Sequence, residues 1–577
     1  MRNLFFVLIT VCSMFFSAHA RTVEIKMFET TDIHGSFFPY DFIHNTFAPG
    51  SLAKISTIIN NARNEYGDNV ILLDNGDILQ GQPSSYYYNY VDTVSPHIVS
   101  QIFNYMKYDA GNIGNHDVET GINVMNRWIS QCDMPILGAN VLDARTGEQA
   151  YTPYVIIQRD GVKIAVLGMI TPAIPAWLPE NVWEGLDFAD MQETAEKWLP
   201  IIKEKENPDI IVGLFHAGED GKLLMNFKEN PSAEIAENVP GFDLILYGHD
   251  HKRENREVVN VQGDSVLLIN PANNGQSVAE VTITLEIDND GNITDKKFKG
   301  NLIKVDDYPA DPSFLTKFTP QFNAIKGFTN EVIGYNENEM SSREAYFGPS
   351  SYVDFLHAMQ LYRTGADISF CAPLSFDATI PKGYLTNGDM FDLVKYENFL
   401  YVMEFTGQQI KDYLDESYGN WVHEMKSSYD PMFILRDDYQ DGDVTRSKFL
   451  HPAYNFDSAA GIIYTVDVTK PKGSKVNIIS MADGSEFDPA KTYKVAINSY
   501  RANGGGELVT EGAGIPKSEI DSRIVHKDSE NFRYYLTEDI KKMKSINPQP
   551  LNQWRFIPDD IVAPAKIRER VKLFGTE

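Results

Sequence analysis

Short apolar runs alternate with stretches of helical periodicity along the first half of the chain. Six of these runs are predicted as strands, because each is short, rich in apolar residues and followed by polar or turn-forming residues. They are residues 23–29, 70–73, 164–169, 210–215, 244–247 and 266–269. Between the first two, Ser51 is typical of a helix cap, and apolar residues from Leu52 to Ala62 recur at helical spacing. This alternation predicts a layered α/β domain.

The pattern changes after this domain. Residues 278–286 alternate as a half-exposed strand and run into the turn sequence 288–292. Beyond it the pattern predicts a connector helix, a helix of a second domain and the two strands of a hairpin, at 313–327, 351–363, 461–468 and 475–480. The segments expected from these changes are a leader over 1–20, an α/β domain over 21–307, a helical linker or hinge over 308–335 and a second domain over 336–577.

Composition and charge narrow the possible partners. The 577 residues are 43% hydrophobic and 23% charged, as in a globular protein of more than one domain. Lys+Arg 51 against Asp+Glu 80 give a formal net charge of −29, which repels phosphate backbones and anionic lipid surfaces. We therefore expect no duplex nucleic acid as a partner, and a monomer that acts on a small molecule.

The N-terminus has the pattern of a secretory signal peptide. Arg2 precedes an apolar run over 4–16, and Ala18-His19-Ala20 is a small-x-small cleavage pattern. We therefore expect cleavage near Ala20 and a periplasmic or secreted location. No later stretch approaches the length of apolar sequence that a membrane span needs.

Polar motifs follow the ends of the predicted strands. In chain order they are Asp32-Ile33-His34, Gly76-Asp77, Gly114-Asn115-His116-Asp117, His216 and Gly248-His249-Asp250-His251. Ligands of α/β sheets gather at the carboxyl ends of strands, so side chains that are distant in sequence should meet there. Carboxylate and imidazole groups without thiolates suit a pair of divalent cations. The glycines beside Asp77, Asn115 and His249 would let the backbone crowd these ions.

Each motif also has an ordinary explanation. Asp-x-His alone is usually a cap or a turn, Gly-Asp is usually a turn, and His216 alone would suit a buried core position. The ordered set, each member following a strand, favours the metal interpretation.

This ordered set resembles the calcineurin-like metallophosphoesterase family over the whole first domain. The resemblance implies a four-layer α/β/β/α fold and two divalent ions, Mn, Zn, Co, Fe or Mg. It implies one ion held by Asp32, His34, Asp77 and His251, and a second held by Asp77, Asn115, His216 and His249, with Asp77 as the bridge. It also implies that His116 is catalytic, with Asp117 as its orienting partner. In that mechanism a metal-bridging hydroxide attacks phosphorus in line with the leaving alkoxide, and His116 stabilises or protonates the leaving oxygen.

The second domain resembles the C-terminal domain of the secreted 5'-nucleotidase family, a smaller α/β domain that binds the substrate. Two segments carry the likeness, 395–407 and 498–506. The resemblance implies that Tyr396 and Tyr500 sandwich the nucleobase, that Asn398 contacts ribose or base, and that Asn503 lines the same cleft.

Details of these segments favour one branch of the family. Where 5'-nucleotidases show a Gly-Gly-Ile-Arg type segment, residues 371–376 contain no arginine, and His251 stands where some of them carry glutamine. The segments 454–457 and 500–506 look like the branch with 2',3'-cyclic-nucleotide 2'-phosphodiesterase and 3'-nucleotidase activity. Two alternatives stay open: a 5'-nucleotidase or nucleotide-sugar hydrolase, and a nucleoside-binding protein without turnover.

Overall fold

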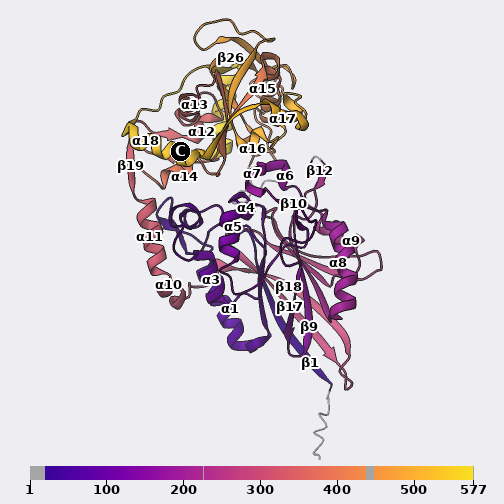
Figure 1. Ribbon diagram of the computed structural model, residues 1–577. Coiled ribbons are helices and arrows are strands. Elements are labelled where there is room, and N and C mark those ends of the chain that lie inside the picture. The colour runs from indigo at the N-terminus through magenta and orange to yellow at the C-terminus, as the bar shows by residue number, and fades with distance from the viewer. Residues whose placement is uncertain (1–19, 222, 225, 437–447, 576–577) are drawn as a thin grey trace, which may run out of the picture.

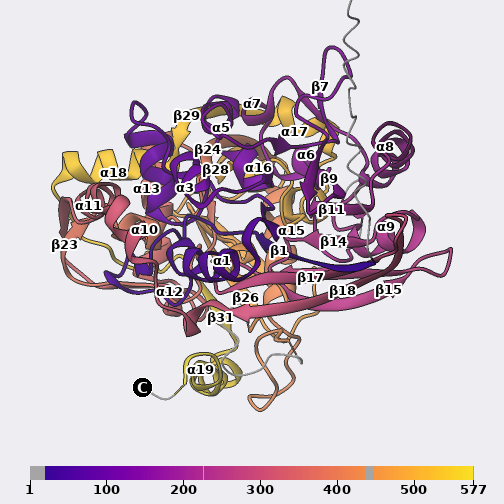
Figure 2. The same cartoon turned by 90° about the horizontal axis from the view of Figure 1, so that it is seen from below.

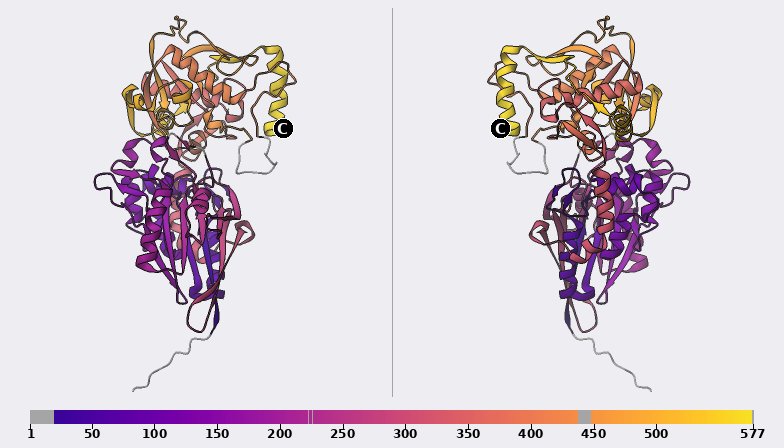
Figure 3. Two further views of the ribbon diagram at one scale, coloured as in Figure 1. Left: turned by 90° about the vertical axis from the view of Figure 1, so that its right-hand side faces the viewer. Right: turned by 90° about the vertical axis from the view of Figure 1, so that its left-hand side faces the viewer.

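The structure is a computed structural model that describes residues 20–575, apart from 222, 225 and 437–447. The predicted signal peptide lies almost entirely outside the described residues. Within the described part, no helix is long and apolar enough to cross a membrane. The chain forms two lobes, one stacked on the other (Figures 1 and 3).

Two six-stranded sheets form the centre of the N-terminal lobe. The first has the order β18 (Ile293–Lys304), β17 (Ser277–Ile287), β1 (Arg21–Thr30), β4 (Val70–Asp74), β5 (Ala110–Asn112) and β6 (Ile136–Leu137). The second has the order β15 (Arg253–Val259), β16 (Ser265–Pro271), β14 (Leu244–Tyr247), β11 (Ile210–His216), β9 (Val162–Ile170) and β8 (Tyr154–Arg159). All six strands predicted for the first domain are confirmed, as is the half-exposed strand that became β17.

The two sheets face each other, and helices cover their outer sides. Val23, Ile25 and Met27 of β1 point into the core between the sheets, whereas Phe28 points into the core under the helices, as the two-residue period of a strand requires. The first sheet is covered by α1 (Leu52–Tyr66), α3 (Ile98–Met106) and α5 (Ile122–Ile129), and the second by α8 (Met191–Glu206) and α9 (Ser232–Asn238). Viewed from below, the helices flank the paired sheets (Figure 2). The expected α/β/β/α layering is confirmed.

The central strands of each sheet are parallel. β1 pairs in parallel with β4, and β11 with both β9 and β14. Their carboxyl ends therefore lie along one edge, and the loops that follow them meet there. That edge faces the C-terminal lobe (Figure 1).

The connector holds two helices instead of the single helix predicted over 313–327. These are α10 (Pro312–Lys317) and α11 (Thr319–Thr329), separated at Phe318. The prediction of one helix is wrong because Pro320, with no backbone N–H to donate, stands in the first turn of a new helix and cannot continue the preceding one.

The C-terminal lobe is built on a five-stranded sheet and several smaller sheets. The larger sheet has the order β25 (Ser458–Ala460), β21 (Ile368–Cys371), β28 (Thr492–Asn498), β24 (Phe399–Thr406) and β29 (Ile524–Asn531). The predicted helix is α13 (Ser351–Thr364), and the predicted hairpin is β26 (Ile462–Asp467) with β27 (Val476–Met481), so both are confirmed. Other helices of this lobe include α14 (Asp389–Leu393), α15 (Gly407–Trp421), α16 (Ser499–Ala502), α18 (Phe532–Met543) and α19 (Asp559–Phe574).

Candidate metal centre

The loops at the carboxyl edge of the two sheets bring the predicted metal ligands together in two groups. Ligand atoms within each group lie within 4.8 Å of one another. The first group is Asp32, His34 and His251, and the second is Asp77, His216 and His249. The predicted ligand Asn115, at the start of α4 (Asn115–Glu119), adjoins the second group.

In the first group one carboxylate faces two imidazoles. His251 Nε2 lies 3.2 Å from Asp32 Oδ1 and 3.1 Å from His34 Nε2. The other oxygen of Asp32 accepts the Thr31 hydroxyl at 2.6 Å and the backbone N–H of His249 at 3.0 Å. Oδ1 is buried and has no hydrogen-bond partner. A buried carboxylate oxygen without a donor fits a cation, because such an atom is costly to leave unpaired.

In the second group the amide oxygen of Asn115 lies between two histidines. Asn115 Oδ1 is 3.1 Å from His216 Nε2 and 2.8 Å from His249 Nδ1. His216 Nε2 is also 3.2 Å from Asp77 Oδ2. Oxygen and nitrogen donors without sulfur match the ligand preferences of Mn²⁺, Zn²⁺, Fe or Co.

The backbone at the ligands is strained. A left-handed φ is found at Asp32 (50°), His34 (48°), Asp77 (55°), His249 (74°) and His251 (56°). Such conformations cost non-glycine residues on the order of 1–3 kcal/mol each and persist only where the surroundings enforce them, typically at functional sites.

Glycines next to the predicted ligands let the neighbouring loops pack closely around them, as the sequence predicted. A Cβ at Gly248 would lie 2.1 Å from Thr31 Oγ1, and one at Gly114 would lie 2.2 Å from Asp77 Oδ1. A Cβ at Gly76 would lie 2.4 Å from the Gly114 nitrogen. These contacts are too short for any side chain, so the close packing requires glycine at all three positions.

Backbone carbonyls orient two of the imidazoles. His34 Nδ1 is 3.1 Å from the Gln80 carbonyl, and His216 Nδ1 is 2.6 Å from the Asn75 carbonyl. These contacts leave Nε2 of both rings directed at the ligand groups, which is the usual outer-shell arrangement for a metal-binding histidine.

Two asparagines tie the sheets together beneath the ligands. Asn75 donates to Glu29 Oε1 of the first sheet at 2.9 Å and to the Phe215 carbonyl of the second at 3.0 Å. Asn112 donates to the Asn75 side chain at 3.0 Å and to the Leu214 carbonyl at 3.0 Å. This buried network joins the two rows of strand ends at the level of the site.

Burial and charge set the ionisation of the ligands. Burial, followed by the charge of His251, lowers the pKa of His34 to about 3, so its imidazole is neutral and able to ligate. Burial opposes ionisation of Asp77, but the positive charges of His216 and His116 outweigh it and hold its pKa well below the usual value. Asp77 is therefore an anion with no need of deprotonation.

His116 lies beside this centre, and its partner differs from the prediction. Its backbone N–H donates to Asp77 Oδ1 at 2.7 Å, and its Nδ1 is 2.5 Å from Glu119 Oε2. The carboxylate of Asp117 instead accepts four backbone N–H groups, those of Asp77, Ile78, Leu79 and Gly114. The prediction that Asp117 orients His116 is wrong: Glu119 contacts the ring, and Asp117 holds the Asp77 loop.

Three tyrosines of the C-terminal lobe form a cluster. Tyr454 lies edge-on to both predicted base-stacking residues, with ring centroids 5.7 Å from Tyr396 and 6.2 Å from Tyr500. The pKa of Tyr396 is raised by burial, then by Tyr500 and by the charge of Glu119 in the other lobe. Tyr454 is a member of this cluster that the sequence interpretation did not include.

The two predicted asparagines lie in the same part of the lobe. Asn503 is buried, and its amide donates to the Ser499 carbonyl at 2.7 Å. The Asn398 carbonyl accepts the Phe532 N–H, and its side chain is half-buried. Their contacts with substrate stay a prediction.

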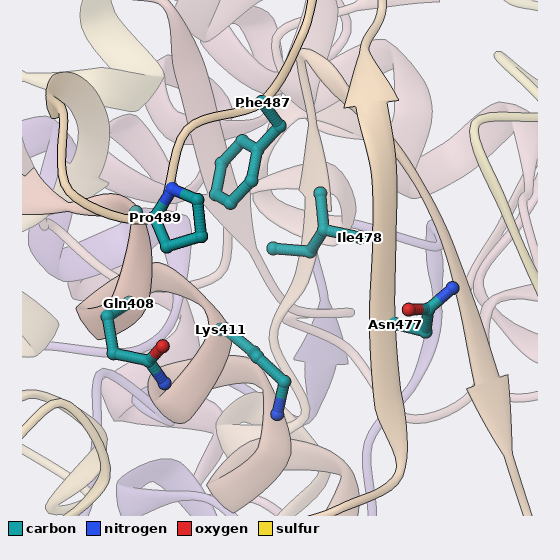
Figure 4. Close-up of a pocket in the computed structure, with 7 residues that line it drawn as sticks. Gln408, Lys411, Asn477, Ile478, Phe487 and Pro489 are labelled. Atoms are coloured by element: carbon teal, nitrogen blue, oxygen red, sulfur yellow. The ribbon is translucent and has the colours of Figure 1, made fainter.

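A separate hollow on the C-terminal lobe contains none of the predicted residues. It lies between α15 and β27, lined by Gly407, Gln408, Lys411, Asn477, Ile478, Phe487 and Pro489 (Figure 4). Lys411 there is already paired with Asp415 at 2.5 Å. The convergent ligands at the sheet edge are therefore the stronger candidate for the functional site.

Comparisons with known proteins divide the chain as the fold does. Residues 25–253 match the calcineurin-like phosphoesterases, and residues 327–511 match the 5'-nucleotidase C-terminal domain. The 2',3'-cyclic-nucleotide 2'-phosphodiesterase/3'-nucleotidase of Salmonella typhimurium is 26% identical, over 94% of this chain and 90% of that protein. The trifunctional nucleotide phosphoesterase YfkN of Bacillus subtilis is 28% identical over 93% of this chain, which spans 39% of that longer protein.

A solved structure supports the fold. A Thermus thermophilus 5'-nucleotidase precursor has a TM-score of 0.63 at 19% identity, covering 93% of this chain and 99% of that one. At 19% identity this similarity shows a shared fold and nothing about activity.

Proposed function

We propose a nucleotide phosphoesterase activity for this chain, which belongs to the calcineurin-like phosphoesterases that carry a 5'-nucleotidase C-terminal domain. The chain is a metal-dependent hydrolase of ester bonds. The reaction we favour opens 2',3'-cyclic nucleotides to 3'-nucleotides and then releases the nucleoside and phosphate.

The observation that carries this proposal is the pairing of the two groups of ligands with the tyrosine cluster. The first group is suited to one cation and the second group, with Asn115, to another. The family resemblance supports Asp77 as the carboxylate that both cations would share. When bound, a pair of divalent cations at these ligands would supply acidification of a water and neutralisation of the phosphoryl charge. The tyrosines would hold the base by stacking, which is tolerant of base identity.

His116 and Glu119 supply the proton chemistry on the protein's side. Glu119 fixes the ring through Nδ1, which leaves Nε2 free to face the leaving oxygen of a bound nucleotide. An imidazole held in this way serves as a general acid for the departing alkoxide.

The charged groups of the C-terminal lobe favour the cyclic phosphodiesterase branch. Arg501 is buried and paired with Asp457 at 3.1 Å, and Arg533 is buried and paired with Glu397 at 2.7 Å. Both guanidinium groups therefore already form ion pairs within the protein. Together with the arginine-free segment 371–376, this argues against a 5'-nucleotidase that grips its substrate through arginine.

Phosphate release from 3'-AMP and 5'-AMP, measured alongside the opening of 2',3'-cyclic AMP to 3'-AMP, tests the substrate choice. We expect hydrolysis of 2',3'-cyclic AMP and of 3'-AMP to exceed hydrolysis of 5'-AMP. Dominant 5'-AMP activity would favour the 5'-nucleotidase alternative, which is supported by a Vibrio vulnificus 5'-nucleotidase that is 30% identical over 42% of this chain. A metal-reconstituted protein inert toward a generic aryl phosphodiester would favour a nucleoside-binding protein.

Two further parts of the proposal concern place and motion. The signal-peptide pattern supports export to the periplasm or outside the cell.

The segment 308–335, which contains α10 and α11, would act as the hinge on which the lobes part for product release. Turnover that persists when the lobes are cross-linked would contradict the hinge.

A further inference from the structure

The loop between β11 and α9 places a carboxylate against one predicted metal ligand. Glu229 Oε1 lies 3.1 Å from His249 Nε2. The other ring nitrogen, Nδ1, lies 2.8 Å from Asn115 Oδ1, within the second group of ligands. The two nitrogens of this ring thus face different partners, with the ligand group on one side and Glu229 on the other.

If Nδ1 ligates a cation, this arrangement fixes the chemical form of the ring. A neutral imidazole that offers the lone pair of Nδ1 carries its proton on Nε2, and that N–H needs an acceptor. A carboxylate acceptor holds the tautomer and ring orientation and increases the basicity of the ligating nitrogen.

The outer partners of the other three imidazoles are uncharged. His34 and His216 contact backbone carbonyls, and His251 Nδ1 lies 3.1 Å from the side-chain amide of Asn273. The second group therefore has an outer carboxylate where the first group has an amide.

Neighbouring contacts hold Glu229 in place. The next residue, Asn230, accepts the Gly218 N–H at 2.7 Å, and the preceding residue, Lys228, pairs with Glu234 at 2.8 Å. The Glu229 side chain is 28% exposed and that of His249 is 12% exposed, so their contact is mostly shielded from water.

We propose that Glu229 is a positioning residue for His249 and sets the affinity of the second cation position. This inference rests on the two-cation site of the proposed function. Loss of an outer-shell partner commonly costs about 10- to 100-fold in metal affinity, and we expect a loss of that size at one of the two positions.

The test is calorimetric titration of chelator-treated full-length protein with Mn²⁺ alone. We expect two binding events in the wild type. Glu229→Ala and Glu229→Asp should each weaken one event about 10- to 100-fold, because alanine has no acceptor and aspartate is one methylene too short. Glu229→Gln should lose less than either, because its amide oxygen still reaches Nε2 and holds the ring but carries no charge. Glu219→Ala is the matched control, since Glu219 lies in the same loop but pairs with Arg256.

The outcomes separate the inference from its premise. Wild-type affinities in both Glu229→Ala and Glu229→Asp would overturn it, as would an equal loss in Glu219→Ala. If Glu229→Ala does not fold, the contrast between the aspartate and glutamine variants decides. A wild type that binds fewer than two Mn²⁺ ions would instead overturn the two-cation site of the proposed function.

Discussion

The metal centre and the tyrosine cluster are held in opposite ways. The predicted ligands of the N-terminal lobe sit at or near the carboxyl ends of buried strands and the start of α4, and five of them have a left-handed backbone. The tyrosines come from short elements and connections between them: Tyr500 lies on α16, Tyr454 in the single turn 453–455, and Tyr396 between α14 and β24. The predicted metal ligands are therefore fixed by the sheets, whereas the proposed base site depends on contacts among short elements and loops. A substitution in one of the two regions should therefore leave the function of the other region intact.

The largest effect is expected from Asp77→Ala. This change removes the carboxylate that we propose both cations share, and the several kcal/mol that bound cations supply correspond to about a thousandfold or more in kcat. Phosphate release from 3'-AMP measures the loss. Adenosine binding, followed by calorimetry, should survive in the same variant, and its disappearance would show that the two regions are not separable.

His116→Ala is expected to lower kcat by about 100- to 10,000-fold, the range of a general acid. Glu119→Ala should give a smaller loss, since the ring stays but is no longer held through Nδ1. Mn²⁺ stoichiometry should be unchanged in both variants. A Glu119→Ala enzyme with the wild-type kcat and pH profile would contradict the role of this contact.

Tyr396→Ala and Tyr500→Ala should mainly raise KM for nucleotides. A base stacked on an aromatic ring gains about 1–3 kcal/mol, so we expect roughly a 5- to 150-fold rise. Hydrolysis of bis(4-nitrophenyl) phosphate, which has no base, should be little changed. Tyr362→Ala is a suitable control, because that side chain is 69% exposed on α13. Equal losses on both substrates would indicate a structural role for the tyrosines.

The smallest effect concerns a histidine that bridges the two lobes. His44, between β2 (Tyr40–Asp41) and β3 (Thr46–Phe47), contacts Asp392 of α14 at 3.0 Å and Asp41 at 2.7 Å. The hydrogen bond to Asp392, then that to Asp41, raises the pKa of His44 to about 10. A raised pKa contributes stability that is complete below the ordinary value near 6.5 and is lost as the pH rises through about 10.

The measurement is the difference in free energy of unfolding between wild type and His44→Ala at pH 6 and pH 10.5. The wild-type advantage should be present at pH 6 and shrink at pH 10.5. The His44 side chain is 55% exposed, so solvent screening keeps the effect below about 1 kcal/mol. An advantage that grows with pH would contradict the bridge.

The comparison of the two regions also explains what the sequence could predict. Strand ends and the Ser51 cap are local signals, and Ser51 Oγ does accept the Lys54 N–H at 3.3 Å. The candidate ligands could be predicted because they come directly after those strand ends. Glu119 was within reach of the same reasoning, because residues three apart on a helix share a face whereas adjacent residues do not. Asp117, adjacent to His116, turns back to the backbone of the preceding loops.

Tyr454 stood out only as part of the segment 454–457, and that segment gave no indication of a contact with Tyr396 or Tyr500. It is separated from Tyr396 by 58 positions, and the two rings meet only because the turn 453–455 packs against the connection between α14 and β24. The prediction of a single connector helix was wrong for a local reason that the sequence already contained, the proline at position 320.

The asparagine pair under the ligands has a consequence for how such a protein diversifies. Because Asn75 and Asn112 clamp the ends of opposing strands, the separation of the two cation positions is inherited from the sandwich itself. The surrounding loops and the whole second lobe are then free to vary without disturbing that separation. A change of substrate can arise in this architecture while the bond-breaking geometry remains constant.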